Sequence, residues 1–551
     1  MSAVQADRFA SRWRIVTPQC NDPNGLSATV FENVADGKLY FAIRGTDEFF
    51  RDVVIADGVH IALLGTPLFQ GQFQALRAKV QEWIANGILP QSFTVAGHSL
   101  GGFLATGLAA EFSTNIDHAY LYNAPGLNGI LGGATAPILR ALEITAPVDP
   151  AKISNIKART GISPIAGLGS QVAPPIKIEI EDQFLSDVPN PPPARNHSQQ
   201  VLTDALAVYA LIERLKPGIP VEEATAIIKA ASSRNAETLE GVVNRLAKVF
   251  GTATASLENR EQLYNAIYAI EDLLPTDGTN PFRLVSLVGE SAGRVANAAN
   301  AQDVDGLAYR YALRELNPFV VLGVDYSVHN AGGVLDRYDP VTGNGLTQTY
   351  LADRAAMLGW FLKYNTADGN IALRSNRIET YLFENKKSSA ETDVGLTVVG
   401  RQSLSINNPV KIVFGSEEGE TITGGDVAAG DRLYGGGGDD ILDGQSGNDY
   451  LEGGAGGDSL TGGAGDDWIE GDSGGDILSG DAGNDVIYAG TKGTEPLTDI
   501  STAIAAGSGL GTGLQGDWLA GGADVLYGNA GLDTFSDPAA GKLPDSVDRP
   551  Q

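Results

Sequence analysis

Cysteine is almost absent from this sequence, since Cys20 is the only one among 551 residues. A single cysteine excludes a disulfide within the chain and any metal cluster that several cysteines would hold. Long apolar runs are also missing: no stretch of about 18 apolar residues occurs, and the opening MSAVQADRFASRWRIV lacks the apolar core of a cleaved signal peptide. The sequence therefore predicts neither a membrane-spanning helix nor a cleaved N-terminal signal, so export would need another route.

Basic residues are few relative to acidic ones: 38 Lys and Arg stand against 67 Asp and Glu, which gives a net charge of −29. More than half of this excess lies between residues 415 and 490, where thirteen Asp and five Glu accompany one basic residue, Arg432. Such a segment repels nucleic acid and anionic lipid, and it attracts divalent cations if its carboxylates converge. We therefore expect no nucleic-acid partner.

Aspartate recurs with a period of nine residues in this acidic segment, and a large apolar residue follows each aspartate two positions later. Units such as GGAGDDWIE match the nonapeptide G-G-x-G-x-D-x-U-x, in which a glycine turn folds around Ca²⁺ and the apolar residue of a short strand stacks inward. The pattern predicts a parallel β-roll and not a disordered acidic tail. The apolar residues are Leu433, Leu442, Leu451, Leu460, Ile469, Leu478 and Ile487.

Calcium is the metal that these residues favour, because it takes about six to eight hard oxygen ligands and glycine turns can present backbone carbonyls beside each carboxylate. We expect several Ca²⁺ ions, folding of the segment on metal binding, and no organic cofactor. The register breaks after Gly490, and one repeat returns near GNAGLD. The candidate ligands are Asp431, Asp440, Asp449, Asp458, Asp467, Asp476, Asp485, Asp524 and Asp533.

These repeats resemble those of the RTX proteins of Gram-negative bacteria. The resemblance covers about 75 residues from residue 415 to residue 490. It implies export through a type I secretion machinery without a cleaved N-terminal signal, and an extracellular location in which calcium folds the roll.

The stretch FTVAGHSLGGFLA, residues 93–105, reads as a buried strand, a glycine-rich turn at Ser99 and a helix. In a nucleophile elbow, the G-x-S-x-G pattern lets the chain turn sharply, so that the serine hydroxyl stands at the helix N-terminus. Gly97 and Gly101 would leave room for that turn. Ser99 is therefore the candidate nucleophile.

The segment KLYFAIRGT, residues 38–46, reads as a strand that ends in a loop upstream of Ser99. An oxyanion hole needs the backbone N–H of the residue after the nucleophile and one from a neighbouring loop, which here are Leu100 and Thr46. Residues 44–46 and 97–102 together resemble the motifs of class 3 lipases, over roughly residues 20–210. The resemblance implies an α/β-hydrolase fold, a mostly parallel sheet flanked by helices, and a serine esterase that acts on lipid esters at a membrane or lipid surface.

The general base is found by elimination among five histidines. An α/β-hydrolase runs in the order Ser, acid, His, so His60 and His98 come too early. His118 follows Ser99 too closely, and His329 lies beyond a long helical region. His197 remains, after the strand IKIEIE and just before a helix, where the family places its histidine.

The acid is where the sequence departs from the family, because no carboxylate follows the strand ISNIKA, residues 153–158. Asp149 precedes that strand and would lie at the wrong edge of the sheet. Asp182 follows the strand IKIEIE, and we choose it over Glu181 and Asp187. A Ser–His dyad assisted by a carbonyl or by Ser163 stays open.

Four regions follow from these motifs: a hydrolase domain at 1–210, a mainly helical region of unknown role at 211–410, the β-roll at 411–490, and a C-terminal region at 491–551 with one further repeat. The favoured function is a lipase or phospholipase A, and the choice between triglyceride and phospholipid stays open. The alternative is an RTX surface or toxin-like protein whose hydrolase domain is degenerate.

Overall fold

The computed structural model divides the chain into two compact units, the N-terminal unit Met1–Pro281 and the C-terminal unit Phe282–Gln551. Among the described residues, no helix is both long and apolar enough to span a bilayer. The structure describes residues 1–17, 20–21, 27–44, 67–126, 144, 147–159, 171–180, 199–232, 238–256, 259–275, 279–339, 345–366, 381–386, 397–398, 410–426, 428, 430–474, 476–483, 485–488, 525–527, 534–535 and 547–548.

One eight-stranded sheet forms the centre of the N-terminal unit. Its strands are β1 (Trp13–Ile15), β2 (Cys20–Asn21), β3 (Ser27–Asn33), β4 (Leu39–Arg44), β5 (Phe93–His98), β6 (Ile116–Tyr122), β7 (Ile153–Ala158) and β8 (Pro175–Ile178). They lie in the order β1-β3-β4-β5-β6-β7-β8, with β2 paired to β3. Pairing is antiparallel from β1 to β4 and parallel from β4 to β8, so the sheet is mostly parallel.

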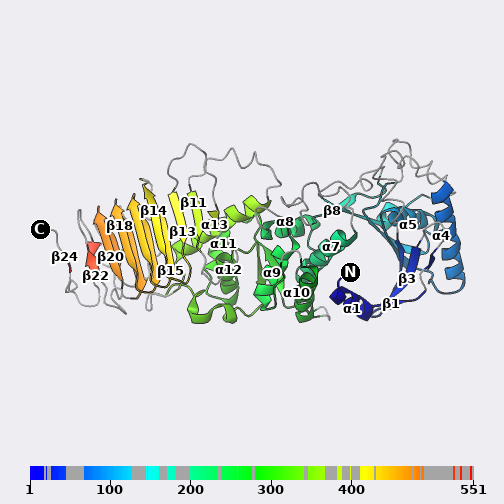
Figure 1. Cartoon of the computed structure of the whole chain (residues 1–551), viewed down its shortest axis with the longest axis horizontal. Coiled ribbons are helices and arrows are strands. Elements are labelled where there is room, and N and C mark those ends of the chain that lie inside the picture. Colours follow the sequence, from blue (N-terminus) through cyan, green and yellow to red (C-terminus); the bar gives the residue numbers. More distant parts are fainter. Residues whose placement is uncertain are drawn as a thin grey trace. The chain divides into compact units, whose positions relative to one another are not determined.

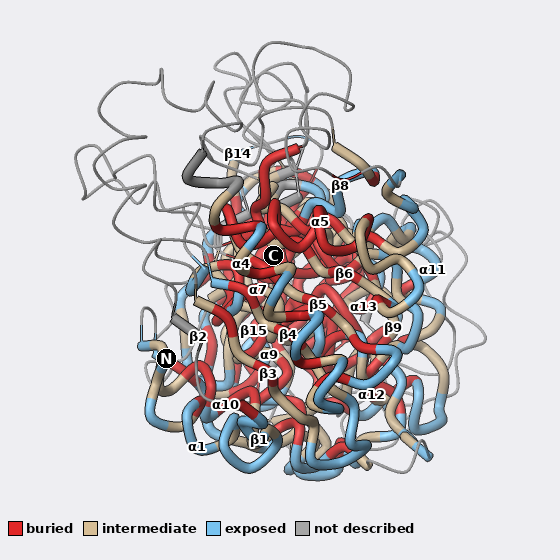
Figure 2. The backbone as a smooth tube through the Cα atoms, turned by 90° about the vertical axis from the view of Figure 1, so that its right-hand side faces the viewer, coloured by how far each residue is buried: buried red, intermediate tan, exposed pale blue. Residues whose placement is uncertain are grey.

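Two helices, α4 (Pro67–Ala85) and α5 (Leu100–Glu111), pack on one face of this sheet. Alternate strand residues face them, as in β5, where Phe93 and Val95 are buried and Thr94 is half-buried. Right-handed crossovers between successive parallel strands place both helices on the same face. α5 is buried almost throughout (Figure 2). The predicted mostly parallel sheet with helices is confirmed.

Five further helices are described in the N-terminal unit. α9 is strongly amphipathic: Val242, Val243 and Leu246 are buried, and Gly251 ends the helix in the left-handed conformation that glycine adopts without strain. A short 3₁₀ segment, Pro150–Lys152, precedes β7. The helices are α1 (Ala3–Arg12), α7 (Gln199–Leu215), α8 (Val221–Ala231), α9 (Leu239–Phe250) and α10 (Arg260–Leu273).

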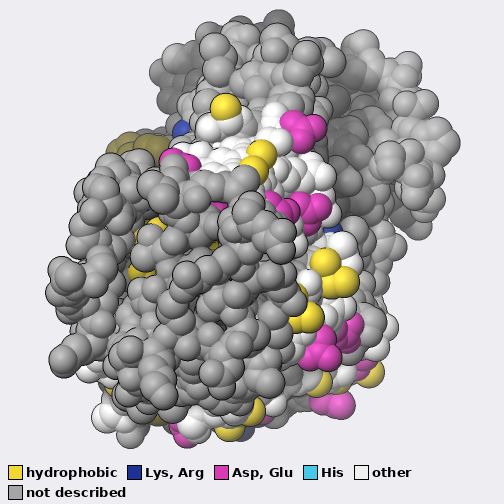
Figure 3. Space-filling model, turned by 90° about the vertical axis from the view of Figure 1, so that its left-hand side faces the viewer, with side chains coloured by type: hydrophobic (Ala, Val, Ile, Leu, Met, Phe, Trp, Pro, Cys, Tyr) yellow, Lys and Arg dark blue, Asp and Glu magenta, His cyan; other side chains and the backbone are white. Residues whose placement is uncertain are grey.

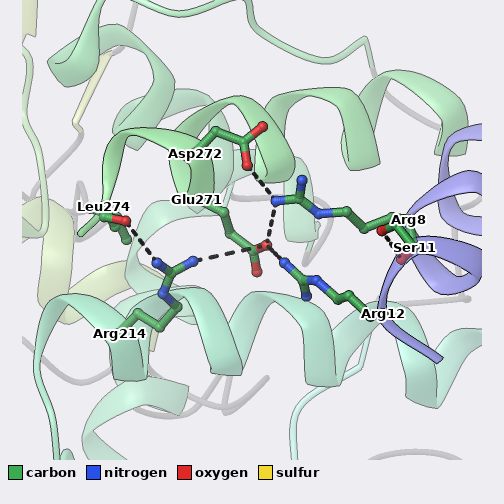
Figure 4. Close-up of polar contacts among 7 residues, drawn as sticks. All are labelled: Arg8, Ser11, Arg12, Arg214, Glu271, Asp272 and Leu274. Atoms are coloured by element: carbon green, nitrogen blue, oxygen red, sulfur yellow. Dashed lines mark hydrogen bonds and ion pairs between the residues drawn. The ribbon is translucent and has the colours of Figure 1, made fainter. Parts of the chain in front are cut away.

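An ion-pair cluster holds α1 against α10 and α7 (Figure 4). The Glu271 carboxylate of α10 is 2.9 Å from Arg12 and 3.4 Å from Arg8 of α1, and 3.9 Å from Arg214 of α7. Arg8 also pairs with Asp272 at 2.5 Å. Because Glu271 is 9 % exposed, three cations compensate one largely buried carboxylate, which fixes the N-terminal helix against the helices that follow the sheet.

Helices and a two-stranded antiparallel sheet begin the C-terminal unit. The helix α12 starts with Asp303, whose side chain accepts a hydrogen bond from the N–H of Gly306 at 2.8 Å and so caps the first turn. Two 3₁₀ segments, Ser327–His329 and Ala331–Gly333, follow. The elements are β9 (Arg283–Ser286), α11 (Ala292–Ala299), α12 (Val304–Arg314), β10 (Phe319–Leu322) and α13 (Gln348–Thr366).

Two sheets of parallel strands form the rest of this unit, and successive strands along the chain alternate between them (Figure 1). The first sheet contains β11 (Tyr381–Asn385), β12 (Thr397–Val398), β13 (Val410–Phe414), β15 (Arg432–Gly437), β17 (Tyr450–Ala455), β19 (Trp468–Ser473), β21 (Val486–Tyr488) and β23 (Thr534–Phe535). The second contains β14 (Thr421–Asp426), β16 (Ile441–Ser446), β18 (Ser459–Ala464), β20 (Ile477–Ala482), β22 (Val525–Tyr527) and β24 (Val547–Asp548). Only β12 pairs antiparallel among these described strands.

The interior of this β-roll contains one apolar side chain from each strand. All seven that the sequence predicted are buried in one cluster, and Val413 and Ile422 extend it toward the N-terminus. The repeat that was expected to return after the register break pairs β22 with β20 and β23 with β21. The roll that the nine-residue period predicted is therefore present.

Helix α13 packs on the outer face of the first sheet of the roll. Its Asp353 accepts hydrogen bonds from Arg432 at 2.5 Å and from the Tyr434 hydroxyl at 2.6 Å. Thr347, just before the helix, donates to Glu452 at 2.9 Å. Helix α13 thus covers part of the roll, a role that its sequence did not indicate.

Candidate functional site

Ser99 lies between the end of β5 and the start of α5 in a backbone conformation that non-glycine residues rarely adopt, with φ 57° and ψ −125°. Such a conformation costs about 1–3 kcal/mol and persists only where its surroundings enforce it. The Ser99 N–H donates to the Tyr122 carbonyl at 2.9 Å, and the Ser99 carbonyl accepts from the N–H of Gly102 at 3.0 Å. These bonds continue the β5–β6 ladder and begin the helix, so the strained residue is fixed on both sides.

Glycines allow the helix to start this close to the strand. A Cβ atom at Gly97 would lie 2.3 Å from the backbone of Gly101, as the G-x-S-x-G spacing predicted. A Cβ atom at Gly102 would lie 2.6 Å from that of Ala124, a contact that the sequence gave no signal for, because Ala124 follows another strand. Larger residues at either position would push α5 away and release the turn.

The Ser99 side chain makes no capping hydrogen bond to α5, although serine is a favourable N-cap residue. Leu100 is the first residue of the helix, so its N–H has no acceptor within the helix. A hydroxyl and an N–H at a helix N-terminus, where the helix dipole favours negative charge, suit the attack on a carbonyl and the stabilisation of the resulting oxyanion.

Three of the predicted site residues, Thr46, His197 and Asp182, lie outside the described residues. The structure describes the elements that flank them: β4 ends one residue before Gly45, β8 ends at Ile178, and α7 begins at Gln199. Parallel strands direct their carboxyl ends to one edge of a sheet, so these flanking elements point toward the edge that holds Ser99.

The other described histidines have different surroundings. His118 of β6 lies with its Nε2 2.8 Å from the Ser154 hydroxyl. His329 belongs to the C-terminal unit, where its ring packs against Tyr311 with centroids 4.6 Å apart. Asp149 lies before β7, and its carboxylate accepts from the N–H of Ala151 at 3.0 Å, so this carboxylate caps a turn at the amino end of the strand.

Glu179 is a buried carboxylate that the sequence reading did not single out. It follows β8 and is 1 % exposed, and it lies 3.4 Å from both Arg159 and Lys229 of α8. Its N–H donates to the Tyr209 hydroxyl at 2.9 Å. Two cations and a tyrosine tie Glu179 to the helices, so this residue anchors α8 to the end of the sheet.

A second candidate site repeats along the β-roll. From Asp449 to Asp485, one oxygen of each repeat aspartate accepts a hydrogen bond from the N–H of the aspartate 18 residues earlier, one coil below. Asp431 and Asp440, at the start of the roll, accept instead from the N–H groups of Lys411 and Glu420. The Oδ1 atom of Asp458 accepts from the N–H of Asp440, and that of Asp467 accepts from the N–H of Asp449, each at 2.8 Å. The carboxylates are therefore oriented identically in every coil.

The other oxygen, Oδ2, is buried and has no hydrogen-bond partner in Asp440, Asp449, Asp458 and Asp467. A Cβ atom at Gly444 would lie 2.5 Å from the Oδ2 atom of Asp449, which explains why glycine recurs at this repeat position. Burial raises the pKa of Asp440, Asp449 and Asp467 to about 7 and that of Asp458 to about 6.

Calcium fits this arrangement, because a buried carboxylate oxygen without a donor and a glycine turn of exposed carbonyls are hard oxygen ligands. Among the described residues, no three His, Cys, Asp or Glu side chains converge on one point, so the backbone would have to complete each coordination shell. On the face drawn in Figure 3, the described charged side chains are mostly acidic. Asp524 and Asp533 lie outside the described residues.

Comparison with known families identifies these repeats. The model of the RTX calcium-binding nonapeptide repeat matches residues 427–460, 461–491 and 518–536, so the chain carries RTX calcium-binding repeats. Solved structures that match include the Lip2 lipase of Yarrowia lipolytica, at 19 % identity and a TM-score of 0.23 over 32 % of this chain and 68 % of that chain. A nonglycosylated form of that lipase matches at 18 % identity and a TM-score of 0.24, over 32 % and 70 %. No curated protein matches.

Proposed function

We propose that this chain is a carboxylic ester hydrolase of the lipase or phospholipase A type, with Ser99 as its nucleophile and an α/β-hydrolase fold in its N-terminal unit. The strained turn at Ser99 carries the proposal. A serine with φ 57° between a parallel strand and a buried helix costs free energy, and presenting the hydroxyl at the sheet edge accounts for that cost.

The reaction uses residues at the carboxyl edge of the sheet. His197 takes the proton of the Ser99 hydroxyl, whose oxygen attacks the ester carbonyl carbon. The N–H groups of Leu100 and Thr46 stabilise the oxyanion. The tetrahedral intermediate collapses to an acyl-enzyme as His197 protonates the departing alcohol, and a water molecule then releases the fatty acid. Asp182 orients His197 in this proposal.

Calcium has a separate role in the proposal, which is to fold the C-terminal unit. The residues that would hold the ions are the repeat aspartates, each with carbonyls of its glycine turns. Bound ions would favour the ionised form of these carboxylates, whose pKa burial raises. Secretion through a type I system and action on lipid esters outside the cell complete the proposal, because RTX repeats are typical of such exported proteins.

Ser99→Ala tests the function directly. Hydrolysis of a p-nitrophenyl ester with a medium-length acyl chain should fall by roughly 10³-fold or more, with unchanged circular dichroism. His197→Ala should lose activity to a similar extent. Ser113→Ala, a serine just beyond α5, is the matched control and should keep full activity. Equal rates in Ser99→Ala and the wild type would reject the mechanism and favour an RTX surface or toxin-like protein with a degenerate hydrolase domain.

A further inference from the structure

Two lysines, Lys157 and Lys177, lie in the same cross-strand row as Ser99, at the carboxyl edge of the sheet. The strand register pairs Tyr122 of β6 with Ile156 of β7, and Lys157 of β7 with Lys177 of β8. Ser99 donates to the Tyr122 carbonyl and so stands one residue beyond the row of Tyr122. The following row therefore runs from Ser99 across β6 to Lys157 and Lys177.

A glutamine links the Lys157 ammonium to the segment that follows β6. Neighbouring strands are about 4.8 Å apart, so two strand spacings place the backbones of Lys157 and Ser99 about 10 Å apart. With the Gln171 amide turned so that its oxygen faces them, that oxygen accepts from Lys157 Nζ at 2.8 Å and from the N–H of Gly126 at 3.2 Å. Gly126 follows β6, the strand between β7 and the Ser99 strand β5, so the Gln171 oxygen connects the ammonium to the segment after that strand.

Two neighbouring positive charges at this edge are unusual in a chain of net charge −29. Lys157 is half-buried, and its pKa is lowered to about 8, first because burial penalises the ammonium and second because Lys177 repels it. Arg159, two residues further along, forms ion pairs with Glu179 and Glu222. A bound anion would offset both the burial and the mutual repulsion of the two lysines.

We propose that Lys157 and Lys177 bind the phosphate of a glycerophospholipid whose acyl ester lies at Ser99. This inference rests on the proposed function. One glycerol unit separates the ester carbonyl from the phosphate, which suits a nucleophile and a cationic pair on one row. The preferred substrate is then a phospholipid, and triglycerides, which offer no anion to the lysines, are poorer substrates.

The proposal predicts a particular dependence on pH. Lys157 loses its charge as the pH rises through about 8, whereas a phosphodiester keeps its charge over the same range. The KM for a phospholipid should therefore rise between about pH 7 and 9, and the KM for a neutral ester should not. Arginine stays charged at these pH values, so Lys157→Arg should remove the rise and keep phospholipid binding at pH 9.

The experiment compares two monomeric substrates that differ by the anionic phosphoglycerol head group, dihexanoyl phosphatidylglycerol and 1,2-dihexanoylglycerol, with the full-length protein in calcium. The ratio of their kcat/KM values should fall roughly 10- to 100-fold in Lys157→Met and in Lys177→Met, the range for a lost hydrogen bond to a charged group. Lys38→Met removes an exposed lysine at the opposite edge of the sheet and should leave the ratio unchanged.

The outcomes separate this proposal from the proposed function. An unchanged ratio in the exposed variant Lys177→Met and the absence of a pH-dependent KM would overturn the phosphate site, even if Ser99→Ala is inactive. Equal losses on both substrates in Lys157→Met would assign Lys157 a structural role and also overturn it. Hydrolysis of both substrates by Ser99→Ala at the wild-type rate would instead reject the hydrolase mechanism.

Discussion

The two parallel sheets of this protein differ in where they place strained backbone. In the N-terminal unit, the described non-glycine residues with positive φ are Ser99 and Asn123, both at the carboxyl edge of the sheet. In the roll, positive φ recurs in coil after coil, mostly at glycine, where it costs little. The first sheet thus has its described strained residues at the edge that holds the candidate nucleophile, whereas the roll repeats a turn that is mostly glycine and can bind the same ion many times.

The two sheets also differ in what stabilises them. The N-terminal sheet buries a broad apolar core with two helices, including Phe73, Trp83 and Phe103. The roll interior holds a single file of one apolar residue per strand, flanked by buried aspartates that lack hydrogen donors on one oxygen. The first sheet is therefore stabilised mainly by packing, and we expect the second to need a cation in place of those missing donors.

Of the changes considered, calcium withdrawal should have the largest effect, and that effect should be confined to the roll. A site occupied at a thousandfold excess over its Kd contributes about 4 kcal/mol, and several sites act together. In EDTA, the full-length protein should lose the β-structure of the roll in far-UV circular dichroism and keep a calcium-independent thermal transition of the N-terminal unit. Adding calcium to about 10 mM, a concentration suited to weak extracellular sites, should restore the lost signal.

Magnesium at the same concentration is the control, because Mg²⁺ demands a small octahedral shell and should not restore the signal. Esterase activity should fall only as far as the N-terminal unit is destabilised, since calcium has no part in the proposed chemical step. Identical spectra in EDTA and in calcium would contradict the metal sites assigned to the repeat aspartates.

Gly97→Ala should produce the next largest effect, this time in the N-terminal unit alone. The added Cβ would lie 2.3 Å from the backbone of Gly101, which cannot move aside as a side-chain end can. We expect a loss of about 3 kcal/mol in the free energy of unfolding and a loss of esterase activity. The calcium-dependent transition of the roll should stay at its wild-type temperature.

Gly293→Ala is the matched control, because a Cβ atom at this position of α11 meets no atom within 4 Å and the backbone is helical. It should leave both transitions in place or stabilise α11 slightly. If Gly97→Ala folded and hydrolysed esters like the wild type, the close approach of strand and helix would not be what holds Ser99 in place.

The sequence predicted the roll more completely than the other parts of the molecule, because each repeat contains the residues that determine its own local structure. Asp, apolar residue and glycine return every nine residues, so one unit sets the register of all of them. The turn at Ser99 was likewise predicted from the local spacing of Gly97 and Gly101. Both features depend on residues that are close together in the chain.

What the sequence did not reveal depends on contacts between distant residues. Ala124, which follows another strand, leaves no room for a Cβ atom at Gly102. Asp353 accepts a hydrogen bond from Arg432, which is 79 residues away in the sequence. In the sequence, Glu179 is one acidic residue among several near a strand, and only the structure shows that Lys229 lies beside it. Such pairs have no period and no motif, so only the folded chain identifies them.

The smallest expected effect concerns buried carboxylates on the outer face of the roll. Glu452 accepts hydrogen bonds from Thr347 at 2.9 Å and from the Tyr450 hydroxyl at 2.8 Å. Burial, and next the charge of Glu470 on the adjacent strand, raise the pKa of Glu452 from an ordinary 4.5 to about 8. Burial also raises the pKa of Asp472 nearby.

A raised pKa means that the folded state binds a proton that the unfolded state has released. The contribution of Glu452 to stability is therefore complete below about pH 4.5 and is lost as the pH rises through about 8. Glu452→Gln keeps an acceptor for Thr347 and Tyr450 but cannot ionise. We expect this variant to flatten the decline of the roll's melting temperature between pH 6 and 9 by a few degrees, the range of about 1 kcal/mol.

The measurement is thermal unfolding of the full-length protein in saturating calcium, which holds the repeat aspartates ionised and removes their titration from the profile. Asp443→Asn is the matched control, because Asp443 occupies the same repeat position as Glu452 on the other sheet and is only half-buried. The control should follow the wild-type profile. If Glu452→Gln declines with pH as steeply as the wild type, then Asp472 carries the proton instead, and the contact between α13 and the roll does not depend on the ionisation of Glu452.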